Sequence, residues 1–113
     1  MMAELSWQEF ERVEMRVGTI LAVSDFEKAK RPAYQLTIDF GEELGVRRSS
    51  AQLTGQYKKE ELIGCQVIAV VNFPVKQIAN FFSTCLVLGA VSEDGAVTLL
   101  KPERPVLNGL RIL

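Results

Sequence analysis

The chain has 113 residues, of which 48% are hydrophobic and 24% are charged, and its formal net charge at pH 7 is −1. This length and composition are typical of one folded domain and exclude a disordered or fibrous chain. The small net charge excludes a general attraction to polyanions, so a basic site must come from local clustering. Histidine is absent, which removes the usual metal ligand and the nucleophile–histidine pairs of many hydrolases.

The cysteines and the lengths of the apolar runs indicate the cellular compartment of the protein. Cys65 and Cys85 are far apart and flanked by aliphatic residues, which favours two reduced, buried thiols over a disulfide. We find no basic segment followed by an apolar run, as in a signal peptide, and no apolar stretch of membrane-spanning length. We therefore expect a cytoplasmic protein without membrane insertion, bound metal or other cofactor.

Residues 5–15 predict a short helix at the start of the chain. Ser6 and Glu9 have the spacing of a capping box, in which each side chain binds the free main-chain N–H of the other residue. Trp7 and Phe10 then lie on one narrow apolar stripe. Such a stripe can cover the domain or contact a second subunit, and we favour the second subunit because a short domain buries little surface alone.

The next part of the chain is typical of strands. Residues 15–26 are rich in β-branched side chains, and Gly18 indicates a bulge or a sharp bend. Residues 33–40 alternate apolar and polar side chains, as a half-buried strand does. Residues 41–45 form the following turn, and residues 46–53 form a third strand whose low apolar content indicates a solvent-exposed face.

The second half adds a helix and more strands. Residues 57–64 predict a short helix that ends at Gly64. Residues 65–73 are almost continuously apolar, which suits a central strand buried on both faces. The remaining segments are a loop at 74–83, a strand at 84–92, an Asp–Gly turn at 93–96, a returning strand at 97–101, and a tail at 102–113 with an Asn–Gly turn and one more short strand.

This order of elements predicts the fold. Three strands, a helix and two or three further strands within about 100 residues are typical of an OB fold. We therefore expect an all-β fold with short helices, namely a five-stranded Greek-key OB barrel with an N-terminal helix and a C-terminal extension. One domain covers residues 1–113, with the helix in 1–14, the barrel in 15–101 and the extension in 102–113.

Basic residues gather where an OB barrel binds its ligands. The second and third strands and two neighbouring loops form the usual oligonucleotide site of this fold. Cations there pair with phosphates, amides and hydroxyls bind bases or ribose, and aromatic rings stack on bases. The basic residues at these places are Lys28, Lys30 and Arg31 in the first loop, Arg47 and Arg48 on the third strand, and Lys76 after the central strand.

These features also have plain structural interpretations. Arg47 and Arg48 point to opposite faces of a strand, and a charged strand face is often simply solvated. Alternation places one of Phe81 and Phe82 in the core and the other at the surface. It also places three side chains of the third strand on the ligand face, and Ser49 joins them only if the strand is bulged. The three are Arg48, Ser50 and Gln52.

Several blocks of the sequence resemble the stand-alone tRNA-binding domain of the CsaA type, an export-related chaperone of bacteria, which is related to domains attached to some methionyl-tRNA synthetases. The blocks are MRVGTILAV, KAKRPAYQLTIDFG, RSSAQLT, LIGCQVIAVVNFP and LVLGAV, and they lie in the family's order. The resemblance implies an OB fold, a homodimer built through the terminal segments, and binding of tRNA without catalysis. It also implies binding of unfolded exported precursors and of the secretion motor.

The resemblance and the residue types together define the expected contacts. We expect tRNA to bind Lys30, Arg31, Arg48, Ser49, Ser50, Gln52, Asn72, Phe73, Lys76, Phe82 and Ser83, and the dimer to form through Trp7, Phe10, Val106 and Leu107. Relatives more often have proline at Val75, glycine at Asn80 and a polar or basic residue at Phe82. These departures make the site less basic and leave room for an apolar peptide.

Two functions follow as hypotheses. The first is a homodimeric, non-catalytic tRNA-binding protein with an added role as a chaperone in protein export. The alternative is a chaperone that binds unfolded exported precursors through the same groove, without physiological tRNA binding. An enzyme is disfavoured, because the sequence lacks histidine, a phosphate-binding glycine loop and cysteines at metal-binding spacing.

Overall fold

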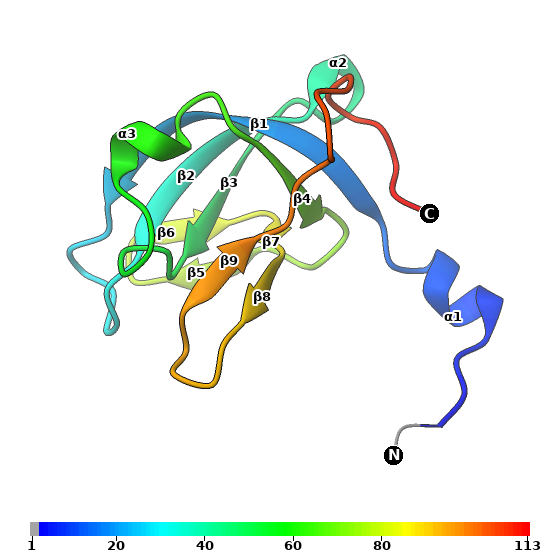
Figure 1. The fold of residues 1–113 in the computed structure, drawn as a ribbon, viewed down its shortest axis with the longest axis horizontal. Coiled ribbons are helices and arrows are strands. Elements are labelled where there is room, and N and C mark those ends of the chain that lie inside the picture. Colours follow the sequence, from blue (N-terminus) through cyan, green and yellow to red (C-terminus); the bar gives the residue numbers. More distant parts are fainter. Residues whose placement is uncertain (1–2) are drawn as a thin grey trace.

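The computed structural model describes residues 3–113, and Met1 and Met2, which belong to the expected N-terminal segment, lie outside the described residues. Five strands form one antiparallel sheet in the order β3-β2-β1-β4-β7, which curls into a nearly closed barrel (Figure 1). The strands are β1 (Met15–Asp25), β2 (Tyr34–Asp39), β3 (Val46–Ala51), β4 (Gln66–Val70) and β7 (Leu86–Val87). This is the predicted OB barrel.

The other elements are short. Two hairpins pair β5 (Lys76–Ile78) with β6 (Phe81–Ser83) and β8 (Gly89–Val91) with β9 (Val97–Leu99). The helices are α1 (Trp7–Glu11), α2 (Gly41–Leu44), which occupies the expected turn, and α3 (Lys59–Leu62), where a helix was expected. Within residues 3–113, each helix falls well short of the length and apolar character needed to cross a membrane.

The β5–β6 hairpin corrects one prediction. Residues 74–83 were expected to be a loop, but two strands of three residues pair there around a two-residue connection. Ile78 and Phe81 lie opposite each other and bring apolar side chains against the barrel, whereas Gln77 and Phe82 form the next pair. The hairpin is stable because of this tertiary packing rather than because of a local apolar pattern. The strand expected at 84–92 is likewise divided into β7 and β8.

Alternation along β2 builds the core. Leu36, Ile38 and Phe40 have 0% exposure, and Thr37 and Asp39 between them are only partly buried. Each fully buried aliphatic or aromatic side chain of this kind contributes about 1.5–3 kcal/mol. The facing strand β4 adds Val67 and Ala69 to the same cluster, while its alternate side chains are half-buried. The predicted pattern of β2 is therefore confirmed, whereas β4, which was expected to be buried on both faces, has Gln66 and Ile68 only half-buried.

The irregularity in β1 lies elsewhere than predicted. The register between β1 and β2 shifts between Ile20 and Ala22, so the bulge is at Leu21 and not at Gly18. Gly18 is instead needed for packing. A Cβ there would lie 2.7 Å from Ile38 Cγ2 and 2.8 Å from the Phe40 ring. Glycine at this position therefore lets the side chains of β2 close over β1.

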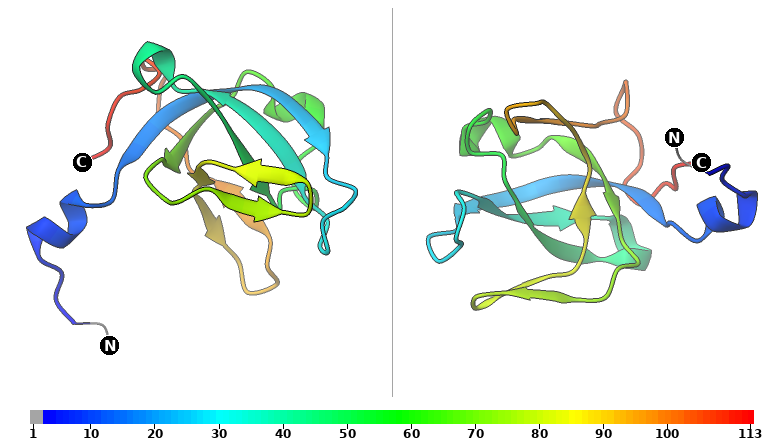
Figure 2. Two further views of the ribbon diagram at one scale, coloured as in Figure 1. Left: turned by 180° about the vertical axis from the view of Figure 1, so that it is seen from behind. Right: turned by 90° about the horizontal axis from the view of Figure 1, so that it is seen from below.

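The terminal segments lie on one side of the molecule (Figures 1 and 2). Ser6 Oγ accepts from the Glu9 N–H at 3.1 Å, and Glu9 Oε1 accepts from the Ser6 N–H at 3.0 Å, which confirms the capping box. Hydrogen bonding of the Glu9 carboxyl, first to the Ser6 main chain and then to its side chain, lowers the pKa of that carboxyl. The helix ends at Glu11, earlier than expected, buries none of its residues, and projects away from the barrel.

The C-terminal tail runs beside the first half of β1. Gly109, with φ of +92°, forms the predicted turn and donates to the Val17 carbonyl at 2.7 Å. The Val17 N–H in turn donates to Leu110 O at 3.0 Å. A single bridge between Arg16 and Arg111 follows. The expected last strand is thus present only as one bridge, but it continues the sheet along the edge of β1.

Candidate nucleic-acid interface

Polar side chains lie in register on the outer face of β2 and β3. Thr37 is opposite Arg48, and Gln35 is opposite Ser50. Arg48 is exposed, Ser50 is half-buried, and Gln52 is exposed just after the strand. Three of the predicted contact residues therefore share one accessible face, as alternation indicated.

The neighbouring residues of β3 turn inward. Ser49 has 0% exposure, and its hydroxyl donates to the Ser50 carbonyl at 3.3 Å. The pairing of β3 with β2 is continuous at this point, so no bulge brings Ser49 to the surface. Its expected place on the RNA face is corrected to the barrel interior. Arg47 also serves the fold, since its Nη1 donates to the Val71 carbonyl at 2.8 Å.

Arg48 is fixed by a stack and a hydrogen bond. Its guanidinium carbon lies 4.5 Å from the centre of the Phe81 ring. Its Nη2 donates to Gln35 Oε1 at 3.2 Å. Phe81 is 2% exposed and packs against Phe26 with ring centres 5.3 Å apart. Gln35 was not among the predicted site residues, although alternation had placed it on the polar face of its strand.

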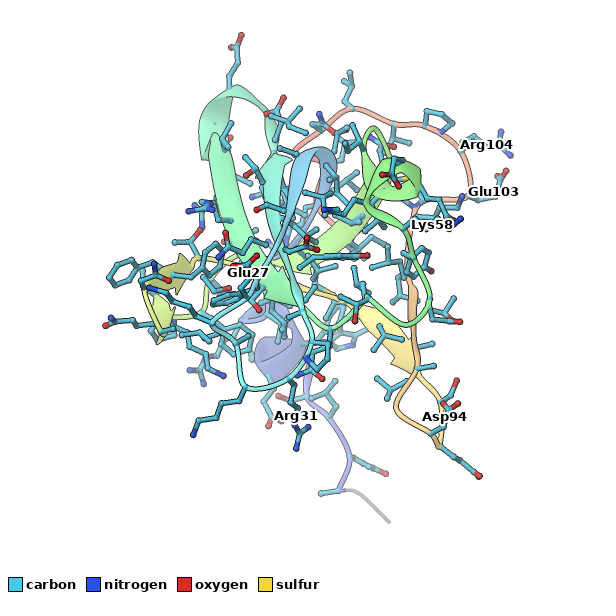
Figure 3. All side chains as sticks on the ribbon, turned by 90° about the vertical axis from the view of Figure 1, so that its left-hand side faces the viewer. Glu27, Arg31, Lys58, Asp94, Glu103 and Arg104 are labelled. Carbon is cyan, nitrogen blue, oxygen red and sulfur yellow. The ribbon has the colours of Figure 1, made fainter. Side chains whose placement is uncertain are left out.

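The same aromatic pair joins the β1–β2 loop to the β5–β6 hairpin. Phe26, Ala33 and Phe81 form a small buried cluster, with Ala29 and Ile78 against it. The loop therefore sits beside the hairpin and presents one acidic and three basic side chains to solvent (Figure 3). These are Glu27, Lys28, Lys30 and Arg31. Lys30 and Arg31 are thus exposed on a loop that packs through Phe26 on Phe81, the ring that also contacts Arg48.

The end of β1 is held by an ion pair next to this loop. Lys59 Nζ lies 2.9 Å from Asp25 Oδ2, and both side chains are partly exposed. The hydrogen bond and the charge of Asp25 raise the pKa of Lys59. The pairing partly neutralises the negative charge of Asp25 at the edge of the basic loop.

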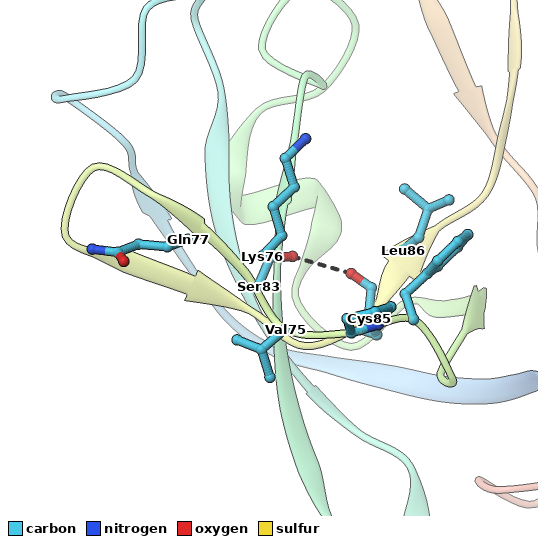
Figure 4. A pocket seen from close by; sticks show the side chains of 8 residues that line it. Val75, Lys76, Gln77, Ser83, Cys85 and Leu86 are labelled. Carbon is cyan, nitrogen blue, oxygen red and sulfur yellow. Dashed lines mark hydrogen bonds between the residues drawn. The ribbon is translucent and has the colours of Figure 1, made fainter.

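A cavity of about 580 Å³ lies between the start of the hairpin and β7 (Figure 4). Val75 and Lys76 point to opposite sides there, and the Ser83 hydroxyl donates to the Cys85 carbonyl at 3.1 Å. Phe82 is 54% exposed but is not among the residues that line this cavity. The lining residues are Phe73, Pro74, Val75, Lys76, Gln77, Ser83, Cys85 and Leu86.

The segment around Thr84 connects the cavity with Arg48. The Thr84 N–H donates to the Arg48 carbonyl at 2.8 Å, and the Arg48 N–H donates to Thr84 Oγ1 at 3.1 Å. Cys85 lies beside them, and burial raises the pKa of its thiol to about 12 although the Arg47 guanidinium acts to lower it. The two surfaces are therefore neighbours on a rigid support.

The side-chain amide of Asn72 forms hydrogen bonds with the main chain. Its Oδ1 accepts from the Glu14 N–H at 3.0 Å, and its Nδ2 donates to the Arg12 carbonyl at 2.6 Å. The exposed Asn72 therefore fastens the segment that follows α1, and its contact with RNA stays a prediction.

The predicted dimer residues form two groups. Trp7 and Phe10 pack edge to face, with ring centres 6.4 Å apart, and line an apolar hollow with Leu5, Ser6 and Leu113. Val106 and Leu107 are also exposed but do not line this hollow. Their joint role in a dimer stays a prediction.

Residues 15–111 match a family model described as "Putative tRNA binding domain". The chain belongs to this family. The tRNA-binding domain is 47% identical to chaperone CsaA from Bacillus anthracis, with a TM-score of 0.93 over 98% of this chain and 100% of that chain. It is 50% identical to the CsaA chaperone from Picrophilus torridus, with a TM-score of 0.90 over 97% of this chain and 100% of that one.

The tRNA-binding domain also resembles part of larger enzymes. It is 38% identical over 112 residues to methionine–tRNA ligase from Thermococcus kodakarensis, covering 98% of this chain but only 14% of that enzyme. The resemblance to the CsaA type and to synthetase-attached domains is thereby confirmed, as is the OB barrel.

Proposed function

We propose that this chain is a non-catalytic tRNA-binding protein that acts as a homodimer in the cytoplasm. The observation that best supports it is the exposed Arg48, fixed on the outer face of β3 in a chain that belongs to a tRNA-binding domain family. Lys30 and Arg31 reach solvent from the adjoining loop. Together these cations provide a basic surface on a chain whose formal net charge is only −1.

Binding would rest mainly on phosphate contacts. Exposed lysine and arginine side chains neutralise phosphates and release counterions, so affinity falls as salt rises. Ser50 and Gln52 add hydrogen-bonding groups on the same face, which suit ribose and base edges. Such contacts favour recognition of RNA shape over a long sequence.

Titration of tRNA at several salt concentrations tests this function. The parent should lose affinity as salt rises, and Arg31→Ala should reduce the slope of log affinity against log salt by about 0.7–0.9, because it removes one exposed cation that would pair with a phosphate. Arg104→Ala is the matched control, because it removes the same charge from an exposed side chain distant from Arg31 in Figure 3. Salt-independent binding, or equal effects of both substitutions, would contradict the proposal.

The apolar surface of the terminal segments supports the homodimer. Trp7 is 76% exposed and Leu113 is 85% exposed, and both line the hollow beside α1. Large apolar side chains gathered in this way are typical of interaction sites. Measuring the solution mass of the parent, of Trp7→Ala and of a chain without residues 1–14 tests the assignment. A monomeric parent would overturn it.

A chaperone for unfolded exported precursors, working with the secretion motor, is the second candidate. It is supported by the cavity under Phe73, Val75 and Leu86, which are 56%, 61% and 46% exposed, and by the likeness to two CsaA chaperones. Suppression of light scattering by an aggregating client protein tests it. Val75→Asp should abolish suppression while tRNA binding persists, and competition between tRNA and client would place both on one surface.

A further inference from the structure

We propose that Arg48 stacks an unpaired RNA base on the face of its guanidinium that is turned away from Phe81, and that Gln35 is the residue that positions it. This inference rests on the proposed tRNA binding and specifies it. The ligand would be a single-stranded or looped segment of RNA whose base can be reached, rather than a regular duplex.

The stack is built from the interior outward. Phe26 and Phe81 lie 5.3 Å apart with their ring planes inclined by 54°, and the Arg48 guanidinium lies over Phe81. Phe81 is 2% exposed, so it cannot contact a ligand itself, whereas Arg48 remains exposed. A planar cation is therefore supported on one side by an aromatic ring and accessible on the other. Guanidinium planes and aromatic rings are the surfaces on which proteins stack unpaired bases.

Hydrogen bonds hold the plane in place. Gln35 Oε1 accepts from Arg48 Nη2 at 3.2 Å and also from Ser24 Oγ at 3.4 Å. Its carbonyl is thus directed at the guanidinium, and within residues 3–113 no protein group binds its amide nitrogen. The Thr84 bonds to the Arg48 main chain fix the base of the same side chain. A side chain that is already ordered loses less entropy on binding.

The arrangement favours a base over a phosphate alone. A phosphate binds the N–H edge of a guanidinium and needs no free face. Here Nη2 already donates to Gln35, and we infer that the face opposite Phe81 is the surface of the exposed Arg48 that is left for a ligand. Bases within a duplex are stacked on their neighbours and cannot reach such a face, so the base must be unpaired. The neighbouring Lys30 and Arg31 would then bind the phosphates beside it.

Binding of an RNA that lacks one base distinguishes base stacking on Arg48 from phosphate binding alone. We compare binding of a single-stranded oligonucleotide, the same strand in a duplex, and versions in which one position at a time is abasic. The parent should prefer the single strand, and one abasic position should weaken binding about tenfold, as expected for loss of one stacked base. Adenosine monophosphate as a competitor shows whether a free nucleotide suffices or a chain is required.

Substitutions test whether the loss of affinity at an abasic position depends on Arg48 and Gln35. Arg48→Lys keeps the charge but removes the plane, so the salt slope should persist and the abasic penalty should disappear. Gln35→Leu should reduce the penalty, whereas Gln35→Glu retains the acceptor oxygen and should preserve it. If the parent binds tRNA in a salt-dependent way but tolerates every abasic position, the stacking inference is overturned and the proposed function stands. If the parent binds neither tRNA nor oligonucleotide, the proposed function itself fails.

Discussion

Asn72 holds Glu14 in place through a hydrogen bond of 3.0 Å from the Glu14 main-chain N–H, while its own amide N–H binds Arg12. Val71, next to Asn72, donates to the Glu14 carbonyl at 2.9 Å. The link between α1 and the barrel therefore depends largely on the end of β4. Because α1 buries none of its residues, its position depends on this link and on the hydrogen bond of 2.8 Å from Arg111 Nη2 to the Glu11 carbonyl.

Removing the Asn72 amide should release α1 without unfolding the barrel. In Asn72→Ala both hydrogen bonds are lost, at a local cost of about 1–2 kcal/mol, and the Glu14 amide should exchange with solvent faster. Asn72→Asp keeps the acceptor for Glu14, so protection of that amide should be largely retained. Hydrogen exchange measures the effect, and thermal unfolding serves as the control. A large fall in the melting temperature would show that α1 is instead part of the core.

Gly18 should not tolerate a side chain. The Cβ of alanine would lie within 3 Å of both Ile38 and Phe40, which are fully buried. Overpacking of this kind costs about 1–3 kcal/mol. Gly55 provides the control, because a Cβ there meets nothing within 4 Å. Denaturant unfolding should show Gly18→Ala well below the parent and Gly55→Ala close to it.

Replacing Ala79 with glycine should increase the stability of the protein. It has φ of +53° at the connection of the β5–β6 hairpin, a conformation that L side chains adopt at a cost. Ala79→Gly should therefore stabilise the protein by about 0.5–1 kcal/mol, after the greater entropy of glycine in the unfolded chain is counted. Asn80→Gly is the comparison, since Ala79 is the one non-glycine residue within 3–113 that has positive φ. Stabilisation by Asn80→Gly alone would contradict this explanation.

The two thiols should differ in reactivity. Burial raises the pKa of Cys85 to about 12, so this thiol stays protonated and protected in the folded state. Cys65 is half-buried and should react first with iodoacetamide at pH 8, as mass spectrometry of the peptides would show. Equal labelling of both in the native protein would contradict the burial of Cys85.

The same thiol should make stability depend on pH in alkaline solution. The unfolded chain ionises Cys85 near its ordinary pKa of 9.0, and the folded protein does so only near 12. The contribution of the protonated thiol is thus fully present below pH 9 and is lost as pH rises toward 12. Cys85→Ala should show a shallower decline across this range, measured by denaturant unfolding. Identical declines would exclude Cys85 as the cause.

Local patterns in the sequence predicted those features that local forces determine. The capping box of Ser6 and Glu9 involves two residues of one turn, and alternation along β2 follows from the geometry of a strand. The separation of Arg48 from Ser49 follows from the same rule. These features need no knowledge of distant partners, which explains why they were predictable.

Other features depend on residues far apart in the sequence. The β5–β6 hairpin has three-residue strands whose apolar side chains pack on Phe26, in a loop more than fifty positions away. Glycine is required at position 18 because the Phe40 ring packs against it. The bulge in β1 lies at Leu21 and contains no glycine. Gln35 gains its role only because Arg48 lies across the strand pair. Such relationships follow from the closed barrel and could not be deduced from one segment.

The pairing of the tail with β1 also bears on how the chain folds as it is synthesised. The Arg16 guanidinium binds the Gly109 carbonyl at 2.8 Å across 93 positions of sequence. During translation this edge of β1 stays open until residues 109–112 leave the ribosome, although β2 and β4 emerge earlier. An open strand edge is a template for pairing with other chains. Pairing of residues 109–112 with β1 should therefore protect the nascent barrel against aggregation.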